Sequence, residues 1–187
     1  MRHLFSFLFL LLTLNGMAQD KAWHGDGPDD YLRFVPLVSV YALKACGAES
    51  ASSWKRLGVN TLAAITLSSG TVFVLKHTVH ERRPDGTDRR SFPSGHTSVA
   101  FAGATILHQE YRHLSPWISV AGYGVATFTA VDRVLRNRHH WRDVVAGAAI
   151  GVLGTKLGYW IGDRLTGEHS RFQVGVSDAG VMLSWQF

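Results

Sequence analysis

The chain has 187 residues, of which 46% are hydrophobic and 18% are charged, and its 19 Lys and Arg against 14 Asp and Glu give a formal charge of +5. This length indicates one domain with at most a short appendage, and the apolar share excludes a disordered linker protein. A single cysteine, Cys46, excludes a disulfide framework, a Cys-rich zinc site and a CxxC redox centre.

The first residues are typical of an export signal. A basic start, Met1-Arg2-His3, is followed by an apolar run from Leu4 to Leu14, and Gly16 and Ala18 are small residues of the kind that a signal peptidase reads. We expect a signal peptide over residues 1–18, with an uncleaved N-terminal anchor as the alternative. Either one sends the chain across a bacterial-type inner membrane.

Five helical segments are expected in a domain over residues 28–166. The first is capped by Asp29 or Asp30 and runs from about Tyr31 to Cys46. The others are expected at Leu57–Leu75, from Ser94 to about Tyr111, at Leu114–Val131, and from about His139 to Gly162. Packed as antiparallel neighbours, they predict an all-α helical bundle.

Two of these segments have the length of a membrane span. The stretches Leu57–Leu75 and Leu114–Val131 contain no formal charge, and they are rich in the small residues that suit helix packing in lipid. The first helix has only ten uncharged residues between Arg33 and Lys44, which favours the alternative of a soluble bundle. The sequence predicts membrane insertion and leaves this alternative open.

The tail over residues 170–187 has a different pattern. Apolar residues alternate with polar or small ones from Phe172 to Val176 and again from Val181 to Phe187, on either side of Asp178-Ala179-Gly180. A period of two on both sides of a Gly-containing turn predicts a short C-terminal β-hairpin.

Positive charge is concentrated at the ends of the apolar helices. Antiparallel neighbours joined by short loops would bring these ends to one side of the bundle, where Arg offers a planar donor fork and Lys a point charge to an anion. The alternative is a solvated basic rim that touches anionic lipid head groups. Eight of the 14 arginines lie in two short stretches of the sequence: Arg82, Arg83, Arg89 and Arg90, then Arg133, Arg136, Arg138 and Arg142.

Residues able to do chemistry lie beside these charges. Ser94, Gly95 and His96 are at the start of a helix, where free N–H groups bind oxyanions and Gly95 allows close approach. His139 and Asp143 are four residues apart, so on a helix Asp143 could hold one ring nitrogen and leave the other as a nucleophile. With His96 as a proton donor, the set suffices for phosphoryl transfer without a metal or another cofactor.

Three spaced motifs resemble the type 2 phosphatidic acid phosphatase and vanadium haloperoxidase superfamily. The first runs from Lys76 to Arg83-Pro84, and the second is Pro93-Ser94-Gly95-His96. The third consists of Arg133, His139 and Asp143, which have the spacing of the family motif. Asp132 departs from the family pattern, which usually has Ser at this position. This costs a hydroxyl, adds negative charge near the anion site and casts doubt on the substrate preference.

The resemblance implies a catalytic mechanism. His139 would attack phosphorus and become a phosphohistidine, Asp143 would orient it, and His96 would protonate the leaving alcohol and then activate water. The phosphoryl oxygens would be bound by Lys76, Arg83, Ser94, the Gly95 N–H and Arg133. It also implies a phosphate monoester or diphosphate substrate carried by a membrane lipid, with no nucleic-acid partner. The oligomeric state stays open.

Several alternatives accompany this interpretation. A soluble bundle would favour a non-specific periplasmic acid phosphatase. A vanadate-dependent haloperoxidase would use His139 as the vanadate ligand, although this chain is short for one. A non-enzymatic protein would bind anionic lipid or nucleic acid through its arginines, although nucleic-acid binding fits poorly with export. His77 and His80 could join His96 at a metal, but no acidic or cysteine set completes that site. Whether or not the signal is cleaved, we expect the site to face the periplasm. The protein would lie in the inner membrane or be free in the periplasm.

Overall fold

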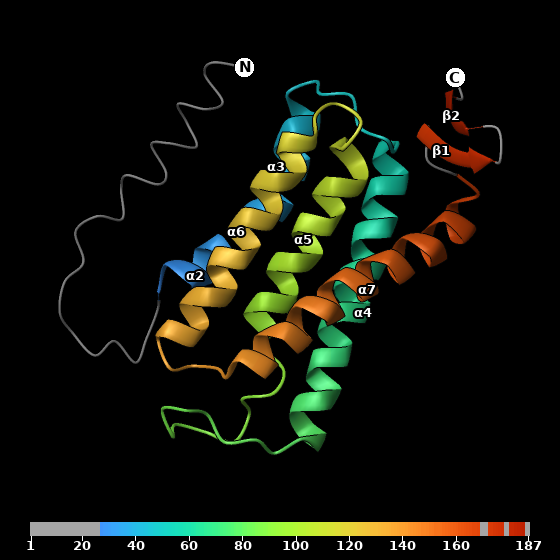
Figure 1. Ribbon diagram of the computed structural model, residues 1–187. Coiled ribbons are helices and arrows are strands. Elements are labelled where there is room, and N and C mark those ends of the chain that lie inside the picture. Colours follow the sequence, from blue (N-terminus) through green and yellow to red (C-terminus); the bar gives the residue numbers. More distant parts are fainter. Residues whose placement is uncertain (1–26, 169–171, 178–179, 186–187) are drawn as a thin grey trace.

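The computed structural model describes residues 27–168, 172–177 and 180–185, and the expected signal peptide lies outside them. The described body is an all-α bundle (Figure 1). Its helices are α2 Pro28–Leu32, α3 Val35–Ala45, α4 Trp54–Thr78, α5 Gly95–Tyr111, α6 Pro116–Leu135 and α7 Trp141–Thr166.

The first expected helix is in fact two, α2 and α3, separated at Arg33 and Phe34. Pro36 explains the break, because its ring would clash with the carbonyl of Leu32 in a continuous helix. The expected cap at Asp29 or Asp30 was therefore misplaced, since both residues lie inside α2. Asp30 still supports the start of that helix, because its carboxylate accepts a hydrogen bond from the Gly27 N–H at 2.9 Å.

Serine residues fix the start of three longer helices. Ser53, Ser94 and Ser115 are the N-caps of α4, α5 and α6, and each hydroxyl accepts a hydrogen bond from a backbone N–H in the following turn. These bonds satisfy N–H groups that have no partner within the helix. They also set the position of Ser94, the second residue of the second motif.

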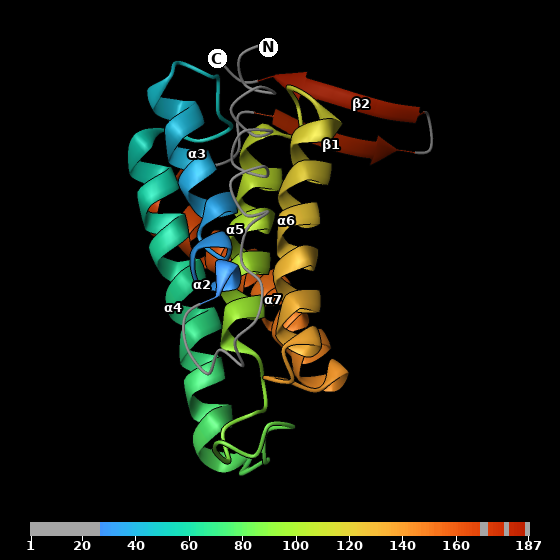
Figure 2. The same ribbon diagram turned by 90° about the vertical axis from the view of Figure 1, so that its left-hand side faces the viewer.

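α5 is the central helix of the bundle. It packs against α3, α4, α6 and α7, and α7 runs obliquely across α4 and α5 (Figures 1 and 2). Small side chains along α5 let its neighbours approach closely, and the core there includes Ala100, Ala102, Ala104 and Ile106, all fully buried.

Glycines on α7 allow the closest helix contacts. A Cβ at Gly147 would lie 2.4 Å from the Ser94 carbonyl oxygen, and one at Gly158 would lie 2.5 Å from the Ala64 backbone. Glycine is required at these two positions because any side chain would push α7 away from α5 or α4. Gly147 thereby holds α7 against the start of α5, where the second motif lies.

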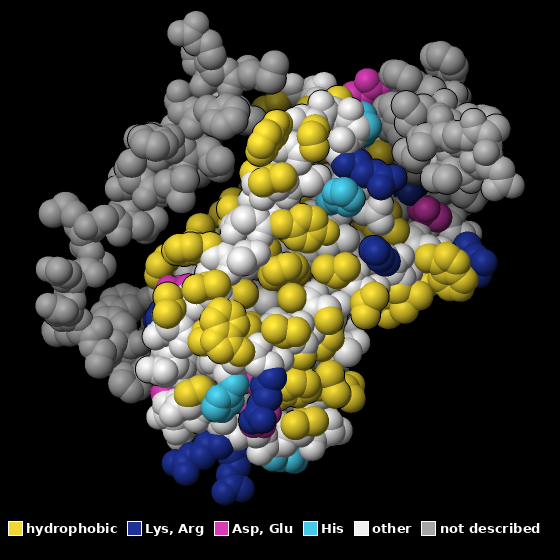
Figure 3. Space-filling view, in the orientation of Figure 1, with side chains coloured by type: hydrophobic (Ala, Val, Ile, Leu, Met, Phe, Trp, Pro, Cys, Tyr) yellow, Lys and Arg dark blue, Asp and Glu magenta, His cyan; other side chains and the backbone are white. Residues whose placement is uncertain are grey.

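α4 and α7 are long and apolar enough to cross a membrane, which by itself is weak evidence that they do. The expectation for Leu57–Leu75 agrees with α4, whereas the second such helix is α7 rather than α6. Hydrophobic side chains cover much of the visible flank of the bundle, and Lys, Arg and His side chains gather at its lower end, where α6 ends and α7 begins (Figure 3).

Two strands follow the bundle, β1 Phe172–Ser177 and β2 Gly180–Trp185. They pair antiparallel, from Phe172 opposite Trp185 to Ser177 opposite Gly180. Two residues of the expected turn, Asp178 and Ala179, lie outside the described residues, so the hairpin as a whole stays a prediction.

Candidate functional site

The eight residues predicted for the site lie on helix ends and loops at one end of the bundle. Two loops, between α4 and α5 and between α6 and α7, hold each other there. The Arg83 guanidinium donates to the Arg138 carbonyl at 3.1 Å, and the Asp85 N–H donates to the Asn137 carbonyl at 3.1 Å. The eight residues are Lys76, Arg83, Ser94, Gly95, His96, Arg133, His139 and Asp143.

His139 is buried among cations, with 2% of its surface exposed. Its Nδ1 lies 3.5 Å from Asp143 Oδ2, and its Nε2 lies 3.4 Å from an Arg83 nitrogen that can donate to it. Burial, followed by the charges of Arg83 and Arg133, lowers the pKa of His139 to about 2. The ring is therefore neutral at physiological pH, and the Arg83 contact favours a lone pair on Nε2.

Asp143 is fully buried in the first turn of α7. Its Oδ2 accepts hydrogen bonds from the Ser91 hydroxyl and, at 2.9 Å, from the His140 N–H. His139 precedes the helix, with His140 as its N-cap, so the expected shared helix face was wrong. The carboxylate instead reaches back from the first turn towards the loop that carries His139.

Three cationic side chains surround His139, and each is held by an oxygen of the protein. Lys76 Nζ donates to the Arg90 carbonyl at 2.7 Å, and Arg83 Nε donates to Asp88 Oδ1 at 2.9 Å. Arg133 is only 5% exposed, and its Nε has no hydrogen-bond partner among the described residues. A buried N–H donor without a partner is costly, so an anion beside Arg133 would satisfy it.

The second motif places Ser94 and Gly95 against this charged group. The Ser94 N–H donates to the Asp143 carbonyl at 2.9 Å, and the Ser94 hydroxyl is 2.9 Å from the Thr97 hydroxyl, which donates to it. A Cβ at Gly95 would make ordinary contacts, 4.0 Å from Lys76 Cε and 3.6 Å from Val72 Cγ1. The protein itself therefore leaves room at Gly95, and close approach of an oxyanion there stays a prediction.

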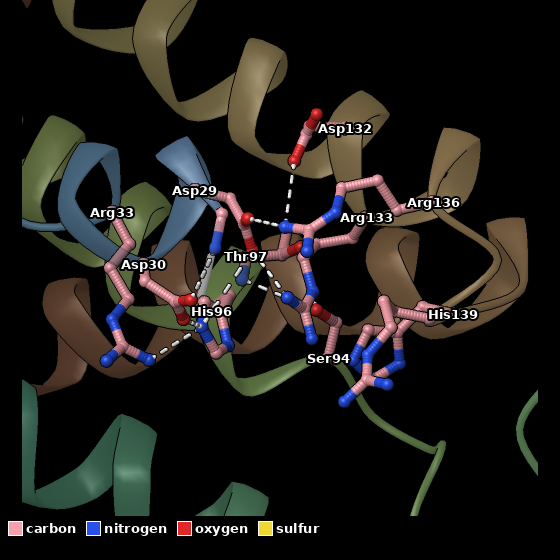
Figure 4. A network of polar contacts seen from close by, with 12 residues as sticks. Asp29, Asp30, Arg33, Ser94, His96, Thr97, Asp132, Arg133, Arg136 and His139 are labelled. Atoms are coloured by element: carbon pink, nitrogen blue, oxygen red, sulfur yellow. Dashed lines mark hydrogen bonds and ion pairs between the residues drawn. The ribbon is translucent and has the colours of Figure 1, made fainter. Parts of the chain in front are cut away.

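The helix α2 contributes two acids that sequence reasoning had assigned only to capping. Asp29 is fully buried and accepts from NH1 of Arg133 and NH1 of Arg136, each at 2.5 Å, and Asp30 Oδ1 lies 2.5 Å from His96 Nε2 (Figure 4). Although burial opposes ionisation, the Arg133 hydrogen bond and charge hold the pKa of Asp29 below its usual value. The sequence held no local signal for these contacts, because both acids lie far along the chain from His96 and Arg133.

Asp132, the departure from the family pattern, faces away from His139. Its Oδ2 lies 3.8 Å from NH1 of Arg136, one helical turn further along α6, and the two residues lie on the far side of Arg133 from His139 (Figure 4). Burial and the neighbouring charge of Asp29 raise the pKa of Asp132, so its carboxyl group acts on the buried Asp29 as well as on Arg136. Asp132 is therefore linked to the anion site through Asp29, which pairs with Arg133, and through Arg136.

A possible metal-ligand set is formed by Asp29, Asp30 and His96, whose ligand atoms lie within 4.8 Å of one another. Two guanidinium groups already occupy Asp29, and an Arg33 nitrogen lies 2.9 Å from His96 Nε2. These positive charges oppose a metal cation. Neither His77 nor His80 belongs to a candidate metal-ligand group in the described part of the chain.

Comparison with known proteins assigns this arrangement to a family. The profile of the PAP2 superfamily matches residues 57–166, more than half of the chain, and this range contains all eight predicted site residues. The crystal structure of Aquifex aeolicus LpxE is similar in fold, with a TM-score of 0.52 and 21% identity over 81% of this chain and 93% of that one.

Curated relatives act on lipid phosphates, according to their names. Lipid A 1-phosphatase of Porphyromonas gingivalis is 45% identical over 136 residues, which are 72% of this chain and 31% of that protein. Lipid phosphate phosphatase 1 of Arabidopsis thaliana is 37% identical over 75 residues, or 34% of this chain and 23% of that protein. The chain thus spans less than a third of the length of either relative. With the family profile matched over most of its bundle, the chain belongs to the PAP2 superfamily.

Proposed function

We propose that this chain is a metal-independent phosphatase that hydrolyses phosphate monoesters or diphosphates of membrane lipids through a phosphohistidine at His139. The observation that carries the proposal is the environment of His139. Its ring is buried and neutral, Asp143 lies 3.5 Å from one nitrogen, and cations surround the other. A neutral imidazole with a free lone pair is a nucleophile, and the surrounding cations favour an incoming phosphate.

The phosphoryl group would be bound by charges that are already in place. Lys76, Arg83 and Arg133 supply positive charge at neutral pH, and the N–H of Gly95 begins a helix whose first N–H groups have no partner within it. In phosphoryl transfer, negative charge is spread over the three equatorial oxygens of the transition state. Donors held in advance around those oxygens stabilise it without reorganisation.

The reaction would take two steps. In the first, the His139 Nε2–P bond forms while the P–O bond to the alcohol breaks, and a proton passes from His96 to the leaving oxygen. In the second, a water oxygen attacks phosphorus, gives its proton to His96, and the P–N bond breaks to release phosphate. Asp143 would stabilise the positive charge that the His139 ring carries in the intermediate.

A lipid phosphate is the substrate class that the molecular surface favours. The flanks of α4 and α7 expose large apolar side chains, including Leu62, Phe73, Leu153 and Trp160, which are 52–70% exposed. If these helices are embedded in lipid, their ends place the site at the level of the head groups. The relatives named as lipid A 1-phosphatase and lipid phosphate phosphatase support this class, with the 1-phosphate of lipid A as the first candidate. We further propose that the site faces the periplasm.

Phosphate release from purified full-length protein tests the activity. The substrates are lipid A, phosphatidic acid and a soluble phenyl phosphate, each assayed with and without EDTA. We expect release in EDTA, with lipid phosphates preferred, and His139→Ala should lower kcat/KM by more than about a thousandfold. The exposed His80, in the loop between α4 and α5, provides a matched control, and His80→Ala should retain activity.

Trapping the intermediate tests the mechanism separately. Acid-labile, alkali-stable radioactivity should appear on the protein after rapid mixing with a 32P-labelled substrate, and it should be absent from His139→Ala. Full activity of the His139→Ala variant would refute the proposed nucleophile. A preference for the soluble ester over every lipid would instead favour a non-specific acid phosphatase.

A further inference from the structure

The short helix α2 lies against the basic end of the bundle, outside the matched family range. Asp29 of α2 is fully buried between the guanidinium groups of Arg133 and Arg136. The backbone of α2 also packs tightly there, since a Cβ at Gly27 would overlap the Arg136 side chain, 1.6 Å from its NH1. A buried, doubly paired carboxylate with this packing is a built contact and not a solvated surface acid.

Asp30, the next residue, makes a similar contact to the second histidine of the site. Its Oδ1 lies 2.5 Å from His96 Nε2, and its other oxygen accepts from the Gly27 N–H, so the start of α2 fixes the carboxylate. The arrangement parallels the first histidine, whose Nδ1 faces Asp143 while that carboxylate is fixed by the start of α7. Each histidine of the site therefore faces an acid held by a helix N-terminus.

We propose that Asp30 is the positioning residue of His96 and Asp29 that of Arg133, so that α2 completes the catalytic site. The proposal rests on the proposed phosphatase function. The Asp30 carboxylate would accept the proton on His96 Nε2 in a hydrogen bond and leave Nδ1 to exchange a proton with the leaving oxygen and, later, with water. Asp30 itself stays ionised throughout, and Asp29 would hold one side of the Arg133 guanidinium so that its remaining N–H groups face the phosphate.

The charges around His96 explain why it needs these acids. Arg133 of α6 and Arg33, just after α2, both face the ring and oppose its protonation, whereas Asp30 and Asp29 favour it. Burial and the Arg133 charge already lower the pKa of His96 to about 4, against the support of Asp30. Without Asp30 the ring would be protonated still less often and would be a poorer proton donor.

The tautomer of His96 shows whether its Nε2 is hydrogen-bonded to Asp30 or to Arg33. Arg33 is a donor 2.9 Å from His96 Nε2 and requires a lone pair there, whereas Asp30 requires a proton on the same nitrogen. Nitrogen NMR of the full-length protein with 15N-labelled histidine measures the tautomer of His96 directly at neutral pH. We expect the Nε2–H tautomer in the unmodified protein and a shift to Nδ1–H in Asp30→Ala. A predominant Nδ1–H form in the unmodified protein would overturn the proposal.

Kinetics test whether the contact serves proton transfer. A nitrophenolate leaves without help from an acid, whereas the alkoxide of an alkyl phosphate does not. We expect Asp30→Asn to lower kcat/KM about a hundredfold for a short-chain alkyl phosphate, and only a few-fold for nitrophenyl phosphate. Asp30→Glu should recover part of the loss, and the exposed Glu49 near the opposite end offers Glu49→Gln as the control.

Two other outcomes separate this proposal from the phosphatase function. Equal losses on both esters in Asp30→Asn, with an unchanged His96 tautomer, would mean that α2 acts on stability alone and would refute the positioning role. The expected tautomers in a protein that releases phosphate from neither of these esters nor from lipid A or phosphatidic acid would uphold the contact and refute the phosphatase function. For Asp29, we expect Asp29→Asn to weaken binding of inorganic phosphate about tenfold, and unchanged binding would contradict its assigned role.

Discussion

His139 shows how burial adjusts a single side chain to its chemistry. Desolvation and the neighbouring cations lower its pKa to about 2, far below the ordinary value of a histidine, so the proposed nucleophile does not titrate near neutral pH. The pKa of His96, lowered to about 4, leaves that ring largely neutral as well. The proton for the leaving group is then shared between His96 and the substrate phosphate, whose second pKa is about 6.

The pH dependence of kcat/KM follows from these values. We expect a plateau from about pH 6 down to about pH 4, and a fall of about tenfold per unit above pH 6, where the substrate loses the shared proton. Because the pKa of His139 is lowered, its protonation should cause no loss of rate on the acid side within this range. Initial rates with an alkyl phosphate from pH 4 to pH 9 test this, and a loss of rate on acidification with a midpoint near 6.5 would contradict it.

The residues of the three motifs were predictable because their chemistry depends on local spacing. His139 and Asp143 are close along the chain, and Ser94, Gly95 and His96 share one helix start. Asp30 is 66 residues from His96, and Asp29 is 104 residues from Arg133, so their contacts depend on how α2 packs on the finished bundle. Nothing local in the sequence distinguishes such an acid from a helix cap.

At the scale of elements, the sequence predicted where helices lie better than how they begin. Long uncharged stretches located α4 and α6, and Ser94 located the start of α5, all within a few residues. α2 and α3 are separate helices because Pro36 would break a continuous one. Pro36 is tolerated where it lies, in the first turn of α3. The start of α7 was expected two residues early, because apolar periodicity does not show that His139 lies in a loop before the helix.

The packing around two glycines predicts different effects on stability for the same Gly→Ala substitution, at Gly158 of α7 and at Gly70 of α4. Gly158→Ala would place a Cβ 2.5 Å from the Ala64 backbone and force α7 away from α4, whereas the exposed Gly70 of α4 has open space around it. We expect Gly158→Ala to destabilise the fold by about 1–3 kcal/mol and Gly70→Ala to be neutral or stabilising by up to about 1 kcal/mol. Thermal unfolding of both variants measures this, and equal melting temperatures would contradict the packing argument.

For the whole molecule, the polar side chains are divided between the two ends of an apolar bundle. The site occupies one end, and a second buried group at the other joins α4 to α7, where Arg56 donates to Asp163 at 2.8 and 3.0 Å and Asn60 donates to it at 2.8 Å. Between them, α4 and α7 present exposed apolar flanks. This division accounts for a mean hydropathy near zero, +0.04, in a chain with few charges in its long helices.

The proposed orientation places the two ends in different compartments. The end with His139 would face the periplasm, and the turn after α3, which carries the exposed Cys46, would face the cytoplasm, because the two lie at opposite ends of the bundle (Figure 1). Cys46 is the single cysteine of the chain, so it reports on one position without further engineering. The matching position at the other end is the exposed Arg89, in the loop between α4 and α5.

Labelling with a membrane-impermeant maleimide tests this orientation in intact spheroplasts. We expect Cys46 to react only after the membrane is permeabilised, and a cysteine introduced by Arg89→Cys in a Cys46→Ser background to react before. The physical reason is that a charged reagent cannot cross the hydrocarbon core, about 30 Å thick, that α4 and α7 would span. Reaction of both cysteines in intact spheroplasts would indicate a bundle outside the membrane, and the reverse pattern would place the site in the cytoplasm.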